Sequence, residues 1–227
     1  MDLLNNQNLE SSPVVANNRM NRERNAVGIN SYEKDIYLSP VEFINKSFKT
    51  KSTFAWLDIC CGRGKALIQT AQYASTHFPS KQITFTGIDL IDMFDPIPEQ
   101  CNSVSLHAQS FFNFESEQKY DLITCVHGLH YMGDKLEAIR KASSMLNHEG
   151  LFIANFDTSC IKSIETDNIQ QKLSAWFKSS NIEYTSRKHL ITIKGSRTLT
   201  VPFQFVGADN KAGSNYTGQE AVDSYYK

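Results

Sequence analysis

The segment that most restricts the fold of this chain runs from Trp56 to Leu67 and reads WLDICCGRGKAL. An apolar stretch suited to a buried strand passes through a turn with Gly62 and Gly64 into a stretch with helical periodicity. These glycines let the backbone approach a ligand closely, and the first amides of the following helix face that ligand. The next apolar stretch ends at Asp89, whose carboxylate can accept hydrogen bonds from both hydroxyls of a ribose. The pattern therefore predicts a nucleotide-like site on an α/β sheet.

Apolar, β-rich stretches alternate with helical stretches along the chain, which is typical of a parallel sheet with right-handed crossovers. Near the C-terminal end, residues 189–194 and 198–205 alternate around a Gly-Ser-Arg turn, as the strands of an antiparallel hairpin do. We therefore expect a mixed α/β sheet of about seven strands, with helices on both faces and a C-terminal antiparallel hairpin. The other predicted strands are 54–59, 83–88, 104–106, 122–126 and 151–156, and the predicted helices are 65–77, 135–146 and 164–177.

The domain organisation follows from composition and periodicity. Residues 1–25 are rich in Asn, Ser and Arg and lack apolar periodicity, so we expect a flexible arm that adds nothing to the core and has solvated arginines. A capping box, Ser39-Pro40-Val41-Glu42, opens a short helix ahead of the first strand. Residues 26–227 are predicted as one domain. Its expected parts are a covering segment and helix at 26–50, the ligand-binding core at 54–156, and the last helix, the hairpin and a polar loop or short helix within 157–227.

Charge and cysteine content exclude several classes of function. The 227 residues carry 23 Lys and Arg against 24 Asp and Glu, interspersed, so no basic field would attract nucleic acid or anionic lipid. Five cysteines without paired C-x-x-C spacing indicate reduced thiols rather than disulfides or a zinc site. No stretch reads as a signal peptide or membrane span. We expect a cytoplasmic monomer or homodimer without a metal, whose partner is a small molecule rather than nucleic acid or a membrane.

Several segments resemble motifs of class I S-adenosylmethionine-dependent methyltransferases. D-I-C-C-G-R-G at 58–64 resembles their D-x-G-x-G-x-G motif, with Cys60 in place of the first glycine, and G-I-D-L at 87–90 resembles their second motif. KYDLITCVHGLHYM at 119–132 is similar to their fourth strand and the loop at the methyl-transfer site, and LNHEGLFIANF at 146–156 to the turn and strand that follow. The resemblance implies a Rossmann-like fold and S-adenosylmethionine as the cofactor.

The resemblance also implies roles for particular residues. Asp58 would orient the loop and the methionine ammonium, and Asp89 would hold the ribose. Gln109 and Ser110 would face the adenine, although this family usually has an acidic residue where this chain has Gln109. An N-terminal segment covers the cofactor in related small-molecule methyltransferases, so Asn30 and Tyr32 are candidates for contacts, with an ordered surface loop as the alternative. The full set implied to bind the cofactor is Asn30, Tyr32, Asp58, Cys60, Gly62, Gly64, Asp89, Leu90, Gln109, Ser110, Val126 and His127.

NAD is the competing ligand for a loop of this kind. It would require G-x-G-x-x-G, whose third glycine allows close packing of helix and strand. Leu67 stands at that position, which favours S-adenosylmethionine. A tight turn without any ligand is the remaining alternative.

Two histidines, His127 and His130, follow the predicted fourth strand, at the sheet edge where α/β proteins bind ligands. Methyl transfer is an in-line displacement, so the protein aligns the nucleophile and removes its proton when needed. Either histidine is therefore a candidate general base. The alternative is that His130 packs under the next helix and that His127 contributes only its backbone.

Together these observations predict a methyltransferase that acts on an oxygen or nitrogen of a small metabolite. No N/D-P-P-Y/F tetrad of base- and amide-methylating relatives follows the fourth strand, where this chain has Val126-His127-Gly128-Leu129. Two alternatives remain open, a non-catalytic cofactor-binding regulatory subunit and a protein methyltransferase.

Overall fold

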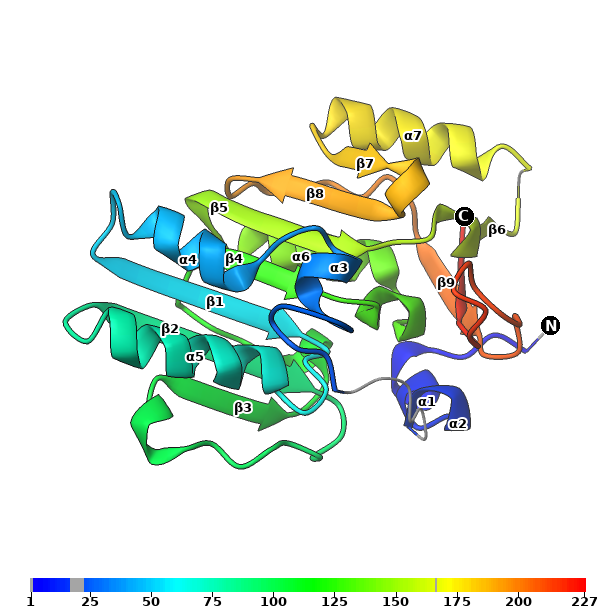
Figure 1. Cartoon of the computed structure of the whole chain (residues 1–227). Helices are drawn as coiled ribbons and strands as arrows, with labels where there is room; N and C mark the ends of the chain where they lie inside the picture. The colour runs from blue at the N-terminus through cyan, green and yellow to red at the C-terminus, as the bar shows by residue number, and fades with distance from the viewer. Residues whose placement is uncertain (1, 17–22, 166) are drawn as a thin grey trace.

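The computed structural model describes residues 2–16, 23–165 and 167–227, and its centre is a seven-stranded sheet (Figure 1). The strand order is β3-β2-β1-β4-β5-β8-β7, with the first five strands parallel and β8 antiparallel to both of its neighbours. This arrangement confirms the Rossmann-like mixed sheet predicted from the sequence. The strands are β1 (Thr53–Ile59), β2 (Gln82–Asp89), β3 (Val104–Ala108), β4 (Tyr120–Cys125), β5 (Leu146–Asn155), β7 (Glu183–Thr185) and β8 (Leu190–Lys194).

Helices cover both faces of the sheet, and β1 explains why. Its side chains alternate between two apolar clusters, with Phe54 and Trp56 on one face and Leu57 and Ile59 on the other. A strand buried on both faces reads as a continuous apolar run. The helices are α3 (Tyr32–Asp35), α4 (Pro40–Ser47) and α5 (Lys65–His77), which lie in front of the sheet in Figure 1, and α6 (Lys135–Ser144) and α7 (Ile169–Ser179), which contribute to the second cluster.

Local signals account for the helix boundaries. The Ser39 hydroxyl accepts a hydrogen bond from the Glu42 amide at 3.3 Å, and Pro40 occupies the first helical position, as the capping box predicts for α4. Helix α5 begins after Gly64, whose φ of 75° is left-handed and favours glycine. No described helix is long and apolar enough to span a bilayer.

A second, three-stranded sheet lies beyond the carboxyl ends of the parallel strands (Figure 1), and it contains an antiparallel hairpin near the C-terminal end, as expected, but built from other residues than predicted. Its order is β6 (Ile161–Ser163), β10 (Asp223–Tyr226) and β9 (Phe205–Asp209). Antiparallel pairing occurs between β7 and β8 and between β9 and β10, whereas residues 198–204 form no strand. The prediction that β8 pairs with 198–205 was therefore wrong. Residues 207–227, expected as loop or helix, contribute to two strands.

A buried lysine ties this second sheet to the main domain. The Lys135 ammonium, 1% exposed, donates to the backbone oxygens of Met132 and Val222 at 2.8 Å each and to the Ser224 hydroxyl at 2.9 Å. Three partners satisfy the three donors of a lysine. The tie holds β10 against the start of α6.

The N-terminal arm (residues 2–16) is ordered, contrary to the expectation that it adds nothing to the core. It contains α1 (Asn6–Glu10) and α2 (Pro13–Ala16), which lie at the end of the sheet where the arrowheads of the parallel strands point (Figure 1). Leu9 is fully buried against Ala208 and Val222, and the backbone of Leu4 pairs with that of Ala208. Burial of one leucine supplies about 1.5–3 kcal/mol toward holding so short a helix. Residues 17–22, also assigned to the arm from sequence, lie outside the described residues.

Candidate active site

A cleft opens at the carboxyl ends of β1, β2 and β4, where parallel α/β sheets bind ligands. This central cleft is lined by Val15, Arg24, Tyr32, Cys60, Cys61, Gly62, Asp89, Leu90, Val126, His127, Gly128, Tyr131 and Gln219.

The central cleft continues into a second cavity, the distal pocket. The two share six lining residues, so they form one elongated site. The distal pocket is lined by Glu10, Val15, Cys60, Ile88, Asp89, Leu90, Gln109, Ser110, Phe111, Phe112, Gly128, Tyr131, Met132 and Gly133.

The loop after β1 is shaped by residues in the left-handed conformation. Cys60, at the position of the family's first glycine, has φ of 58°, and Gly62 has φ of 59°. A cysteine in this conformation costs on the order of 1–3 kcal/mol, which explains why glycine is usual there. Gly128 approaches the loop so closely that a Cβ would lie 2.5 Å from the Cβ of Cys60. The backbone of both loops therefore forms the floor of the cleft.

Asp89 lies where the two cavities meet. Its carboxylate accepts hydrogen bonds from the Gly62 amide at 2.9 Å and the Ile91 amide at 3.1 Å, and it is 8% exposed. A carboxylate has about four acceptor sites, so it can also accept from ribose hydroxyls. An elongated cavity with a carboxylate midway and a backbone floor fits a nucleoside joined to an amino acid, as in S-adenosylmethionine.

Asp58 lies beneath the cleft rather than in its wall. It is fully buried, and its oxygens accept hydrogen bonds from the Tyr32 and Thr124 hydroxyls, each at 2.6 Å. Thr124 in turn accepts from the Trp56 indole at 2.8 Å. Burial raises the pKa of the Asp58 carboxyl to about 7, although the hydrogen bonds from Thr124 and Tyr32 oppose that rise. Tyr32 separates Asp58 from the cleft, so Asp58 is placed to orient Tyr32 and the loop.

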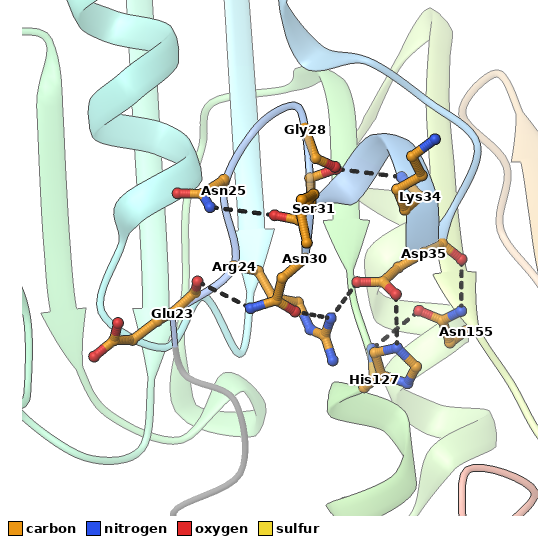
Figure 2. A network of polar contacts seen from close by, with 11 residues as sticks. Glu23, Arg24, Asn25, Gly28, Asn30, Ser31, Lys34, Asp35, His127 and Asn155 are labelled. Carbon is orange, nitrogen blue, oxygen red and sulfur yellow. Dashed lines mark hydrogen bonds and ion pairs between the residues drawn. The ribbon is translucent and has the colours of Figure 1, made fainter.

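His127 is held by polar contacts that join the segment before α4 to the loop after β4 (Figure 2). Its Nε2 lies 3.6 Å from Asp35 Oδ1, and its backbone amide donates to Asn155 Oδ1 at 3.2 Å. The Asn155 side chain also donates to the Asp35 carbonyl at 3.1 Å, and Arg24 pairs with the Asp35 carboxylate. His127 thus presents its imidazole to the cleft with a carboxylate behind it. Arg24, expected to be solvated, is 16% exposed at the side chain.

His130 occupies a different environment. It is 1% exposed, does not line either cavity, and packs against the rings of His127 and Tyr216 at centroid distances of 5.6 and 5.4 Å. Burial lowers the pKa of His130 to about 3, with His127 and Lys135 adding to the effect. At neutral pH its imidazole is uncharged and a weak base.

The structure brings most of the sequence-predicted residues together. Asn30 lies outside both cavities and accepts a hydrogen bond from Arg24 at 3.1 Å, while Gly64 caps α5. Cavity residues that sequence reasoning missed include Glu10, Val15 and Gln219, which come from the two ends of the chain and carry no local motif. The predicted residues that line the site are Tyr32, Cys60, Gly62, Asp89, Leu90, Gln109, Ser110, Val126 and His127.

The chain was compared with curated proteins and with solved structures. A search of curated sequences finds no significant match. Similar structures include coclaurine N-methyltransferase bound to N-methylheliamine and S-adenosylhomocysteine (17% identity, 50% of this chain and 34% of that one, TM-score 0.37). The plantazolicin methyltransferase BpumL in complex with S-adenosylhomocysteine is also similar (19% identity, 66% of this chain and 51% of that one, TM-score 0.38). So is the N-methyltransferase NodS from Bradyrhizobium japonicum WM9 (14% identity, 78% of this chain and 97% of that one, TM-score 0.40). The chain thus spans about a third of the length of coclaurine N-methyltransferase and about half of the length of BpumL.

The family assignment comes from a sequence model. Residues 31–200, most of the chain and all of the main sheet, match the model described as a methyltransferase domain. The match includes the glycine loop, Asp89 and the His127 loop, which are the elements that build the cleft. The chain therefore belongs to the methyltransferase domain family.

Proposed function

We propose that the protein transfers the methyl group of S-adenosylmethionine to an oxygen or nitrogen of a small metabolite, and that His127 accepts the proton of that nucleophile. The observation that carries the proposal is that His127 lines the central cleft, next to Gly128 in the same loop, and pairs with Asp35 behind it. An imidazole backed by a carboxylate is suited to take a proton, because the carboxylate stabilises the imidazolium that forms.

The bound cofactor supplies an electrophilic methyl carbon on a sulfonium. His127 would take the O–H or N–H proton of the acceptor at Nδ1, because its Nε2 faces the Asp35 carboxylate at 3.6 Å. Asp35 stabilises the imidazolium that results. Tyr32, whose hydroxyl donates to Asp58 beneath it, forms part of the cleft wall. The polar Gln219 and Tyr131 bound the side on which an acceptor would lie.

The cleft combines apolar and polar lining, as sites for small molecules do, which favours a small acceptor. Turnover with labelled cofactor against small-molecule and protein pools, with mass spectrometry of the product, tests the acceptor class. Methylation confined to proteins would contradict the small-metabolite assignment. Cofactor binding without any methylated product would instead favour a regulatory subunit.

Substitution of the two histidines tests the proton acceptor. His127→Asn is expected to lower turnover by about 10²–10⁴-fold while S-adenosylhomocysteine affinity stays within a few-fold of wild type, because the cofactor contact is through backbone. His130→Asn is the matched control, because His130 is buried outside the cleft, and it is expected to lower stability and keep the turnover of the folded enzyme. Full turnover in His127→Asn would show that alignment alone carries the reaction.

A further inference from the structure

The distal pocket has walls of mostly apolar character, and two carboxylates line it. Leu90, Phe111 and Met132 contribute apolar surface, and the charged lining side chains among the described residues are Asp89 and Glu10. Asp89 stands at the junction with the central cleft, where the ribose belongs. Glu10 is therefore the acid that faces the part of the pocket beyond the ribose, which is the place of the purine base.

Glu10 is held there by the docking of α1. Asn5 caps the helix by accepting a hydrogen bond from the Asn8 amide at 2.8 Å, and Leu9, next to Glu10, is fully buried. The Asn6 side chain accepts from the Asp134 amide at 2.9 Å, at the start of α6. These contacts fix the end of α1 against the main domain.

A direct contact joins Glu10 to the loop after β3. The Ser110 hydroxyl donates to Glu10 Oε1 at 2.6 Å and accepts from the Phe112 amide at 3.2 Å. Ser110 is 8% exposed, so this bond is largely shielded from water. One hydroxyl uses one of about four acceptor sites on a carboxylate, and the others remain available to a ligand.

The chemistry of the base identifies what such a carboxylate would bind. A 6-aminopurine presents an amino group that donates hydrogen bonds, whereas a 6-oxopurine presents a carbonyl oxygen in the same place. An ionised carboxylate accepts from the first and repels the second. Gln109, the neutral residue beside Ser110, carries an amide that both donates and accepts, so it does not discriminate in this way.

We infer that Glu10 accepts a hydrogen bond from the exocyclic amine of the bound cofactor and selects an adenine over a 6-oxopurine. The N-terminal arm thereby becomes part of the cofactor site. This inference rests on the identity of the cofactor and not on the proposed acceptor or on His127.

Titration calorimetry with S-adenosylhomocysteine and its deaminated analogue, S-inosylhomocysteine, tests the inference without turnover. Wild type is expected to bind the adenosine compound more tightly by about tenfold to a hundredfold, the value of a hydrogen bond to a charged group. Glu10→Gln should weaken binding of the adenosine compound and strengthen binding of the inosine compound, because the amide N–H can donate to the carbonyl oxygen. Glu33→Gln, the same change at an exposed position on α3, should leave both affinities unchanged.

Hydrogen exchange of residues 2–16 in Glu10→Gln provides the check on docking. Wild-type protection together with a reduced or inverted affinity ratio supports the inference. An affinity ratio equal to that of wild type overturns it, and so does an equal loss of both affinities, which would indicate general loosening of the arm. If wild type binds neither compound, the cofactor assignment is wrong, and the inference falls with it.

Discussion

The buried carboxyl of Asp58 makes the stability of the protein depend on pH in a way that substitution can isolate. The folded carboxyl has a pKa of about 7 because it is fully buried, compared with 3.8 for an ordinary aspartate. Between these values the folded state binds a proton that the unfolded state has released. The free energy of unfolding must therefore fall as pH rises toward 7, and level off above it.

The size of this loss follows from the two pKa values. One pKa unit corresponds to about 1.4 kcal/mol, and the unfolded carboxyl is already ionised at pH 5. The Asp58 carboxyl is therefore expected to lower the free energy of unfolding by about 3 kcal/mol between pH 5 and pH 8. His130 acts in the opposite direction. Its pKa of about 3 lies below the ordinary 6.5, so the unfolded state binds more protons at pH 5 and stability rises with pH. The gain from His130 is about 2 kcal/mol over the same range.

Urea unfolding at pH 5, 6.5 and 8, followed by tryptophan fluorescence without cofactor, separates the two contributions. The wild type should show a shallow profile because the contributions offset each other. Asp58→Asn should gain stability steadily from pH 5 to pH 8, and His130→Asn should lose it. If Asp58→Asn has the pH profile of wild type, the carboxyl is not protonated in the folded state near pH 6 and the reasoning is wrong.

Three further outcomes are expected. Asp89→Asn should weaken S-adenosylhomocysteine binding at least about tenfold in calorimetry, since it removes the charge that strengthens hydrogen bonds to the ribose; equal affinity would refute the ribose assignment. Lys135→Met should lower the free energy of unfolding by about 2–4 kcal/mol, because the backbone oxygens of Met132 and Val222 lose a buried donor; a change under about 0.5 kcal/mol would refute that tie. Residues 2–16 and the segment around Tyr32 should gain protection from hydrogen exchange when S-adenosylhomocysteine binds, and identical exchange in both states would contradict a covering role.

The sequence was most informative where local chemistry and burial agree. Helix α5 was predicted with its observed bounds, 65–77, because the glycine turn and the helical periodicity after it mark the segment. The parallel strands were found because burial on both faces leaves unbroken apolar runs. The position of Asp89 at the cleft followed from its place at the end of β2.

Prediction failed where the partner of a segment lies far away in the sequence. Residues 198–204 alternate because they pack against α7, where the Trp176 indole donates to the Thr200 carbonyl at 2.9 Å and its ring lies 6.2 Å from that of Phe203. Alternating apolar and polar residues indicate only that every second side chain is buried. A segment that packs against a helix can have this pattern as well as a strand in a sheet. Pro202 also lacks the amide that strand pairing needs. Helix α1 was missed because five residues carry little helical signal, and its order comes from docking.

Two residues of the central cleft, Val15 from the N-terminal arm and Gln219 from the segment just before β10, lie about two hundred residues apart in the sequence. Contacts between segments so distant in the sequence form slowly, because the chain between them must first be brought together. The parallel strands can assemble from neighbouring units of the chain, but the walls contributed by the two ends require both to be present. During synthesis, the glycine loop and Asp89 would emerge long before Gln219. We therefore expect a nascent chain to acquire its sheet first and the full outline of its active site only after β10 has left the ribosome.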